Sequence, residues 1–588
     1  MKSVSFITTV IAATLMSCAM TALAQSANQS PLQKPAARGG SITGRIVSEA
    51  GKPMSNARVM VSGSGRQSVR RTINTDEAGR FVADDLPRGS YAITVQASGY
   101  VLVRSPGDTV HHRPGDSVDL VLRKGGVITG KVTTPDGDPV AGVQMSATLL
   151  RDERGRRNES TYGSSRYTDD RGVYRLFGLP AGTYIVAAAS KSLGGGQMLS
   201  AYGDDVPTYH PSATRDTAAE IVIQWGAEAT GIDIRYRGER GHTISGTVID
   251  SSLADTVVGG ISVLLVRASN DTLEAQSFVQ PRDSERTFVF HGVPDGDYYM
   301  TARRSPYQSD DGAASKRVPV KVRDRDISGV GISLVPLGSI AGRLTLDPAS
   351  RELKCETRLA PAAEETLMSL SSEDTDSADP SYRFSSALYT PDSKGDFVFQ
   401  GLPAGRFRVD SRLLLDEAWY VRALTVPGPT NTPVDASGTG IVVRQGVRIN
   451  GVRLVLGEGA ASIRGRVAAD KEGASLPDRL RVHLVPSEPN SADETLRFIE
   501  AEVQSDNSFK LMNVAPGRYW LMARQLPEED AKQRIPRPQA WNAAVRAALR
   551  REAVASSVAI ELKPCQRVAD YQLVYKPPKE APPANRPK

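Results

Sequence analysis

Two short patterns recur five times along this 588-residue chain, and their fixed order constrains the fold more than any other feature. The first pattern, Ile-x-Gly, begins at Ile42, Ile128, Ile244, Ile340 and Ile463. The second, Gly-x-aromatic, follows each copy 45 to 63 residues later, counted from glycine to glycine, and ends in Tyr91, Tyr184, Tyr298, Phe407 and Tyr519. Such a repeat predicts tandem copies of one domain rather than one large core.

The residues between the two patterns alternate between apolar and polar types, as in the segment 80–100. This period-two alternation around a Pro-Gly turn is typical of half-buried strands. Each repeat closes with another short alternating segment, at 118–122, 232–236, 330–335, 452–456 and 571–575. The sequence therefore predicts an all-β chain of about five tandem sandwiches, each of about seven strands.

One segment departs from the strand pattern. Between 539 and 553, Trp541, Val545 and Leu549 recur at helical spacing, with arginines elsewhere around the turn. We expect one amphipathic helix there, inserted before the last strands of the fifth repeat and capping the edge of that sandwich.

The repeat boundaries divide the chain into a linker, five sandwiches and a tail. The linker spans 25–38, and the Pro-rich tail 577–588 is expected to be disordered. The expected sandwiches are 39–123, 124–238, 239–336, 337–457 with an acidic insertion, and 458–576 with the helix.

The amino terminus has the pattern of a removable export signal. Lys2 precedes an apolar run over 4–20, and Ala22 and Ala24 supply a small-x-small cleavage site. We expect cleavage after Ala24 and a secreted or periplasmic protein. The alternative is a lipoprotein anchored through Cys18. No other apolar run is long enough to span a membrane.

The segments 137–144 (GDPVAGVQ) and 168–188 (TDDRGVYRLFGLPAGTYIVAA), following Ile128-Thr129-Gly130, resemble the carboxypeptidase regulatory-like domain family. The resemblance extends over nearly all of 39–576 and is strongest in the first two repeats. It implies an immunoglobulin-like or prealbumin-like sandwich, similar to the B-type repeats of collagen adhesins. It also implies an accessory or surface role, with no catalytic residue.

The sequence lacks the motifs of the common hydrolases. None of the six histidines has the spacing of a zinc peptidase, and there is no nucleophile elbow, P-loop or dinucleotide-binding motif. We expect His111 and His112 in a solvated loop. The acidic run 364–380, with Asp374, Asp376 and Asp379, is expected to be a solvated insertion rather than a calcium loop. The chain is therefore not expected to be an enzyme or to hold a metal or cofactor.

The sequence gives less indication of which molecules the protein binds than of its fold. The net charge of +6 is spread among alternating acids and bases, which argues against a nucleic-acid partner. Stacking on sugars and packing between sandwiches are both open roles for Trp225, Trp419, Trp520 and Trp541. Lys131 is the one lysine at its position of the opening strands, and its expected outward direction disfavours the isopeptide bonds found in the adhesin relatives.

Two cysteines remain after signal removal. If consecutive sandwiches are joined end to end, Cys355 and the loop with Cys565 meet at the junction between the fourth and fifth. A disulfide is expected there in an oxidising compartment, and two buried free thiols are the alternative.

The repeated corner itself has a structural interpretation. Proline ends one strand, glycine makes the turn, and the aromatic residue begins the next strand, with its hydroxyl bonded back to the turn. The whole pattern predicts an exported, non-catalytic scaffold of the bacterial cell envelope, a monomeric rod that presents surfaces to a protein or polysaccharide. The alternatives are a carbohydrate-binding accessory protein of polysaccharide degradation and a regulator of a separately encoded peptidase.

Overall fold

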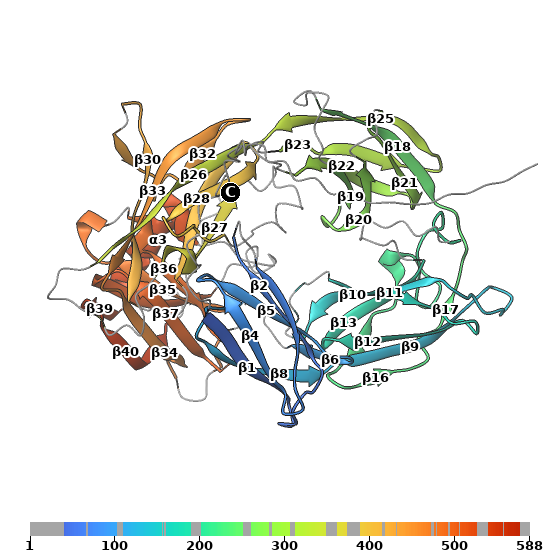
Figure 1. Cartoon of the computed structure of the whole chain (residues 1–588), viewed down its shortest axis with the longest axis horizontal. Helices are drawn as coiled ribbons and strands as arrows, with labels where there is room; N and C mark the ends of the chain where they lie inside the picture. Colours follow the sequence, from blue (N-terminus) through green and yellow to red (C-terminus); the bar gives the residue numbers. More distant parts are fainter. Residues whose placement is uncertain are drawn as a thin grey trace, which may run out of the picture.

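A computed structural model gives the arrangement of the chain (Figure 1). It describes residues 40–576, apart from 66–68, 103–109, 154, 156, 158–159, 190–200, 251–259, 281–284, 306–311, 349–354, 356–361, 373–388, 414–417, 431, 472–474, 478, 492–493, 505, 526–538 and 557. The expected signal 1–24, the linker 25–38 and the tail 577–588 lie outside the described residues. No described helix is long and apolar enough to cross a membrane.

Strands dominate the described residues and group around five large clusters of buried side chains, which we number units 1 to 5 along the chain. Unit 1 pairs the sheet β4-β1-β8-β6 with the sheet β3-β2-β5-β7. Its strands are β1 (Gly40–Ser48), β2 (Arg58–Gly63), β3 (Arg70–Asn74), β4 (Arg80–Leu86), β5 (Tyr91–Gln96), β6 (Tyr100–Leu102), β7 (His111–His112) and β8 (Ser117–Lys124).

Unit 2 pairs the sheet β11-β10-β13-β14, with β15 beside β13, with the strands around β9. Its elements are β9 (Gly126–Thr133), β10 (Gln144–Asp152), β11 (Thr161–Tyr167), β12 (Val173–Leu179), β13 (Gly182–Ala188), β14 (Thr208–Tyr209), η1 (Arg215–Thr217), β15 (Ile221–Ile223), β16 (Glu228–Ala229) and β17 (Ile234–Arg235).

Unit 3 differs because β23 pairs with both β22 and β25, which joins its two layers into one eight-stranded sheet. Its strands are β18 (His242–Asp250), β19 (Ile261–Arg267), β20 (Leu273–Val279), β21 (Thr287–Val293), β22 (Gly296–Arg304), β23 (Ala313–Ser315), β24 (Val318–Val322) and β25 (Ile327–Pro336).

Unit 4 pairs the sheet β28-β26-β33-β30-β31 with the sheet β27-β29-β32. Its elements are β26 (Gly338–Asp347), η2 (Ala363–Glu365), β27 (Thr366–Ser372), β28 (Asp396–Leu402), β29 (Gly405–Leu413), β30 (Trp419–Pro427), β31 (Pro433–Asp435), β32 (Ile441–Val443) and β33 (Arg448–Glu458).

Unit 5 pairs the sheet β37-β34-β40 with the sheet β36-β35-β38-β39. Its elements are β34 (Ala461–Ala469), β35 (Leu480–Pro486), η3 (Pro489–Ser491), η4 (Thr495–Arg497), β36 (Ile499–Glu502), β37 (Ser508–Val514), β38 (Gly517–Gln525), η5 (Gln539–Trp541), α3 (Ala543–Ser556), β39 (Val558–Leu562) and β40 (Arg567–Tyr575). The all-β tandem sandwich with one inserted helix, predicted from the sequence, is confirmed. Short extra strands take most units beyond the expected seven.

Helix α3 covers the face of a sheet, whereas we expected it to cap an edge. Leu549 and Ala553 are fully buried against Val485 and Met522 of the inner strands β35 and β38. The helix packs on this face because the outward side chains of those two strands are apolar at that point, so the sheet buries residues on both sides.

The opening and closing strands of each unit are parallel neighbours. In unit 1, β1 pairs with β8 over Thr43↔Ser117 to Ser48↔Leu122, and the same parallel pairing joins β18 to β25, β26 to β33 and β34 to β40. Because both strands run in one direction, the chain enters each unit at one end and leaves at the other.

The glycine of Ile-x-Gly is required by this parallel pair. A Cβ on Gly246 would lie 2.0 Å from the carbonyl oxygen of Val330 on the closing strand and 2.8 Å from the ring of Phe288. The glycines at 44, 342 and 465 face a closing-strand carbonyl in the same way, and Gly130 faces the carbonyl oxygen of Ile232 just before β17, all at 2.0 to 2.2 Å. Since backbone cannot give way as a flexible side chain can, only glycine fits at these five positions.

We expect Gly246→Ala to destabilise unit 3 by about 1–3 kcal/mol, because the new methyl group overpacks the contact with Val330. Gly331→Ala, in the partner strand β25, is the matched control, since a Cβ there meets nothing within 4 Å. Amide hydrogen exchange across unit 3 measures both effects. Equal protection in the two variants would contradict the steric argument.

Three of the four connections between consecutive units are very short. Only Gly125 separates β8 from β9, only Leu337 separates β25 from β26, and Gly459 and Ala460 separate β33 from β34. Linkers of this length leave little freedom between neighbouring units, so the packing at each junction sets the angle.

The described units do not form the expected rod. Unit 4 returns to unit 1, where the Thr390 hydroxyl donates to the Ser64 carbonyl oxygen at 2.7 Å and Arg113 lies 3.5 Å from the Glu365 carboxylate. Units 1 to 4 thus form a closed circuit with unit 5 beside unit 4 (Figure 1). The rod prediction is wrong because strand direction determines only where a unit is entered and left. The bend at each junction depends on side-chain packing between units.

We expect Glu365→Lys to open this circuit. Burial raises the pKa of Glu365, and the neighbouring Arg113 and Arg88 oppose that rise. A lysine there faces the same two cations and leaves buried charge without a partner. Small-angle X-ray scattering should show a larger radius of gyration than for the wild type. Glu561→Lys, on the exposed strand β39, makes the same charge change away from the contact, and an equal expansion in both variants would contradict the closure.

Candidate functional site

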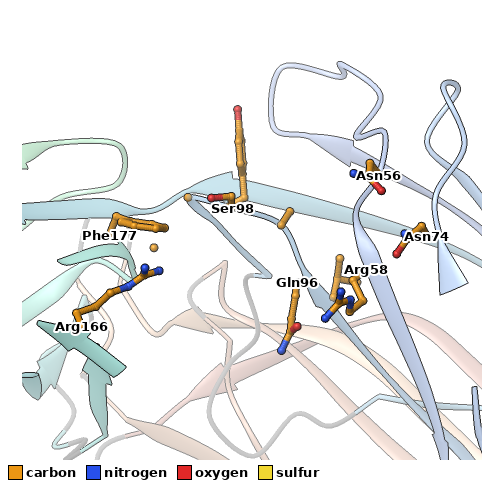
Figure 2. A pocket seen from close by; sticks show the side chains of 12 residues that line it. Asn56, Arg58, Asn74, Gln96, Ser98, Arg166 and Phe177 are labelled. Atoms are coloured by element: carbon orange, nitrogen blue, oxygen red, sulfur yellow. The ribbon is translucent and has the colours of Figure 1, made fainter. Parts of the chain in front are cut away.

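A polar recess lies where unit 1 meets unit 2 (Figure 2), with a volume of about 570 Å³. Unit 1 contributes the ends of β2, β3 and β5 and the turn before β6, and unit 2 contributes β11 and β12. The recess is open to solvent on the surface of the two units.

The unit 1 wall is a row of three polar side chains across neighbouring strands. Arg58 on β2 is directly opposite Asn74 on β3 and Gln96 on β5. Directly paired residues share one face of a sheet, so the three side chains lie together on the outer face. The next residue, Val59, is fully buried on the opposite face. Strand alternation thus holds the row in place.

The tight turn between β5 and β6 forms the floor near the junction. Ser98 and Gly99 connect Ala97 to Tyr100, and Gly99 has a φ of 75°, which glycine adopts without strain. The Gly99 carbonyl oxygen accepts a 2.9 Å hydrogen bond from the backbone N–H of the linker residue Gly125. The turn is therefore tied to the connection between the two units.

The unit 2 wall is a guanidinium stacked on an aromatic ring. The Arg166 guanidinium on β11 lies 4.2 Å from the centre of the Phe177 ring on β12, and Figure 2 shows both facing the recess. Phe177 is half-buried and directly precedes Gly178, whose φ of 73° allows a bulge in β12. Stacking fixes the plane of the guanidinium and leaves its N–H donors available.

The electrostatics of the recess are one-sided. Its lining contains two guanidiniums, Arg58 and Arg166, and no carboxylate. Within the described part of the chain neither arginine makes an ion pair. Side-chain amides of Asn56, Asn74 and Gln96 add neutral donors and acceptors. Such a lining suits an anionic, hydroxyl-rich ligand.

The histidine pair lies elsewhere and is not in a solvated loop, so that expectation is wrong. His111 and His112 form strand β7, are 5% and 9% exposed, and pair with Ala92 and Tyr91 of β5. Pairing with β5 makes the two residues an edge strand of the sheet and takes them out of a solvated loop. The described residues contain no group of three side chains able to hold a metal ion.

His483 is likewise structural. It lies on β35, 3% exposed, and burial, followed by the charges of Arg524 and Arg481, lowers its pKa to about 3. It is therefore neutral in the folded protein and has no access to a ligand in solution.

The acidic run is ordered at its beginning. Residues 366–372 form β27, which pairs with β29 from Thr366↔Leu413 to Ser372↔Phe407. The expectation of a solvated insertion is wrong for this part, since Leu367 and Met368 are buried in the unit 4 core. Asp374, Asp376 and Asp379 lie outside the described residues.

The four tryptophans lie at contacts rather than on one exposed sugar-binding face. Trp225 lies under the Arg123 guanidinium at 5.2 Å, at the junction of units 1 and 2, and its Nε1 donates to Glu153. Trp520 packs against α3. Trp419 and Trp541 lie between units 4 and 5, where their carbonyl oxygens accept hydrogen bonds from Asn513 and Arg408.

Two further candidates have clear positions. Lys131 is exposed on β9, as expected.

The Cys355 and Cys565 sulfurs are bonded to each other, with 5.3 Å between the Cα atoms, across the contact of units 4 and 5. Cys565 is in the turn before β40, and its backbone N–H donates to the carbonyl oxygen of Gly459 in the linker.

The corner aromatics are part of the cores. The tyrosine hydroxyl donates to the carbonyl oxygen four residues earlier in four units, at 2.7 to 2.9 Å: Tyr91 to Pro87, Tyr184 to Pro180, Tyr298 to Pro294 and Tyr519 to Ala515. Burial raises the pKa of Tyr184, so its phenol stays neutral and donates. Phe407 is buried in the same place without a hydroxyl.

Exchanging tyrosine and phenylalanine at the corner positions should lower the free energy of unfolding in one unit and raise it in another. Tyr184→Phe loses one hydrogen bond to Pro180 and should cost about 1 kcal/mol in unit 2. Phe407→Tyr should add up to about 1 kcal/mol in unit 4, since the Pro403 carbonyl is in the equivalent position. Hydrogen exchange of each unit reports the change. Loss of ligand binding by Tyr184→Phe without loss of protection would contradict a structural role.

The comparisons with known proteins identify unit 1 by family. Residues 41–123 match the family model of the carboxypeptidase regulatory-like domain, which confirms the resemblance predicted from the sequence for the first repeat. The curated proteins contain no match to this chain.

Several solved structures are similar in part. The Bacillus anthracis TIE protein is 14% identical over 50% of this chain and 51% of its own, with a TM-score of 0.14, so this chain spans about half of its length. A streptococcal ancillary pilin is 11% identical over 50% and 98% of the two chains, with a TM-score of 0.14. A putative polysaccharide-binding protein of Bacteroides thetaiotaomicron is 8% identical over 30% and 72%, with a TM-score of 0.16. At these TM-scores, none of them assigns a function to this chain.

Sequence reasoning missed the lining of the recess. Arg58, Asn74 and Gln96 occupy outward strand positions, and alternation alone predicts that they face solvent. Their arrangement as a row depends on strand register, and their meeting with Arg166 depends on how unit 2 docks. The one sequence feature that could have indicated the recess is that no Asp or Glu occupies the outward positions of β2, β3 and β5.

Proposed function

We propose that this protein is an exported, non-catalytic binding protein of the cell envelope that captures its ligand in the recess between units 1 and 2. The observation that supports the proposal best is the pair of guanidiniums, Arg58 and Arg166, which lie in one recess without a carboxylate partner. Two exposed guanidiniums that line one recess without a carboxylate give it a positive local potential, which attracts anionic ligands.

Export is part of the proposal and has two supports. The expected signal 1–24 precedes the folded units in the sequence. The Cys355–Cys565 bond fits an oxidising compartment, because such bonds are rare in reducing ones. The family resemblance also suggests a second candidate function, the regulation of a separately encoded peptidase. A capture experiment distinguishes this function from envelope binding.

Capture of envelope material tests the proposal. Wild-type protein immobilised on beads should retain a component of solubilised envelope, and the Arg58→Glu and Arg166→Glu double variant should lose at least tenfold of it, because reversing both charges repels an anion. Arg80→Glu, an exposed arginine on β4 outside the recess, is the control and should retain it.

Three results would contradict the proposal. These are equal retention by the double variant and the control, chemical conversion of the retained material by the protein, and retention of a peptidase as the single partner. The first removes the recess as the site, the second removes the non-catalytic role, and the third favours the regulator.

A further inference from the structure

The recess has both charged guanidinium groups and neutral amide and hydroxyl groups, and this combination limits the chemical class of ligand that it can bind. Arginine recognises carboxylates through two parallel N–H donors, whereas neutral amides and hydroxyls pair with hydroxyl groups. The recess has both sets: Arg58 and Arg166, and the uncharged Asn56, Asn74, Gln96 and Ser98. A ligand that fills it therefore has carboxylates separated by hydroxyl-bearing groups.

The surface next to the recess extends the same chemistry along the sheet. Outward positions of β2, β3 and β5 continue from the Arg58 row in direct register to Met60 with Thr72 and Thr94, and then to Ser62 with Arg70 and Ala92. No carboxylate occurs among these outward residues, and Arg70, Thr72 and Thr94 are exposed. This face is open to a chain longer than one sugar.

We propose that the recess binds a uronic acid-containing oligosaccharide, with one carboxylate on Arg58, a second on Arg166, and sugar hydroxyls on the amides. The inference rests on the proposed function and names the chemical class of its ligand. The stacked pair of Arg166 and Phe177 holds one guanidinium plane in place before binding, which reduces the entropy lost when the carboxylate docks.

A nucleic acid is a poorer fit to the same recess. Its affinity comes mainly from the number of phosphates neutralised, and two guanidiniums neutralise few of them. A single small anion uses the arginines but leaves the amide row idle. An acidic peptide also offers carboxylates to the arginines and backbone groups to the amides, so it serves as a competitor in the test.

Isothermal titration calorimetry with oligogalacturonate, at low and at physiological salt, tests the inference on the full mature chain. The comparison ligand is the same oligosaccharide after its carboxyl groups are reduced to alcohols. Arg58→Gln and Arg166→Gln should each weaken oligogalacturonate binding about tenfold to a hundredfold, the loss of one charged hydrogen-bonded contact. Arg80→Gln should bind as the wild type does, and the reduced oligosaccharide should bind at least tenfold more weakly.

Gly125→Val provides a second variant that substitutes none of the residues lining the recess. A Cβ at Gly125 would lie 2.7 Å from Gly178, so the larger residue forces units 1 and 2 apart and should also weaken binding. This outcome distinguishes a cleft shared by two units from binding to unit 1 alone.

Other results overturn the inference. They are equal binding of the reduced oligosaccharide, unchanged affinity in both glutamine variants, tighter arginine-dependent binding of an acidic peptide or single-stranded DNA, and no binding of oligomers of galacturonate, glucuronate or mannuronate. Each of these results rejects the uronate ligand. The proposed function still holds if envelope capture depends on Arg58 and Arg166. If capture fails as well, both fail.

Discussion

The parallel contact between the first and last strands of each unit underlies the rest of the structure. It requires a glycine wherever the two strands touch, because a closing-strand carbonyl lies about where a Cβ belongs. It also sends the chain out of each unit at the end opposite to its beginning. Consecutive units therefore follow each other directly, through linkers as short as Gly125. The recess exists because such a linker holds the turn 97–100 of unit 1 against Phe177 of unit 2.

The same short linkers explain why contacts between distant parts of the chain recur. Unit 4 meets unit 1 through Thr390 and Glu365, and the Cys355–Cys565 bond joins units 4 and 5 across 210 positions of sequence. Rigid junctions make such contacts reproducible, since few orientations of each unit compete with the observed one. Trp225, Trp419 and Trp541 lie at these junctions and Trp520 packs against α3, which leaves the polar recess as the better candidate for ligand recognition.

Much of the local structure could be predicted from particular residues. Pro180, Gly182 and Tyr184 indicated a corner, and the alternation in 80–100 indicated strands β4 and β5. The helix over 539–553 was visible from the spacing of Trp541, Val545 and Leu549. His111 and His112 were misplaced because a two-residue strand has no periodicity to detect. Strand β27 was missed because its flanking residues 373–380 are acidic, which masked a short apolar segment.

The sequence by itself determined the kind of unit and its repetition, since glycine, proline and corner aromatics act through local backbone geometry and near-neighbour packing. The sequence also lacks the common spacings of metal-binding and nucleophile motifs. Only the tertiary structure decided the bend at each junction, the closure of units 1 to 4 and the placement of Arg58 and Arg166 on one recess. These features depend on side chains from different units packing against each other, and no pattern within one unit encodes the angle at which its neighbour docks.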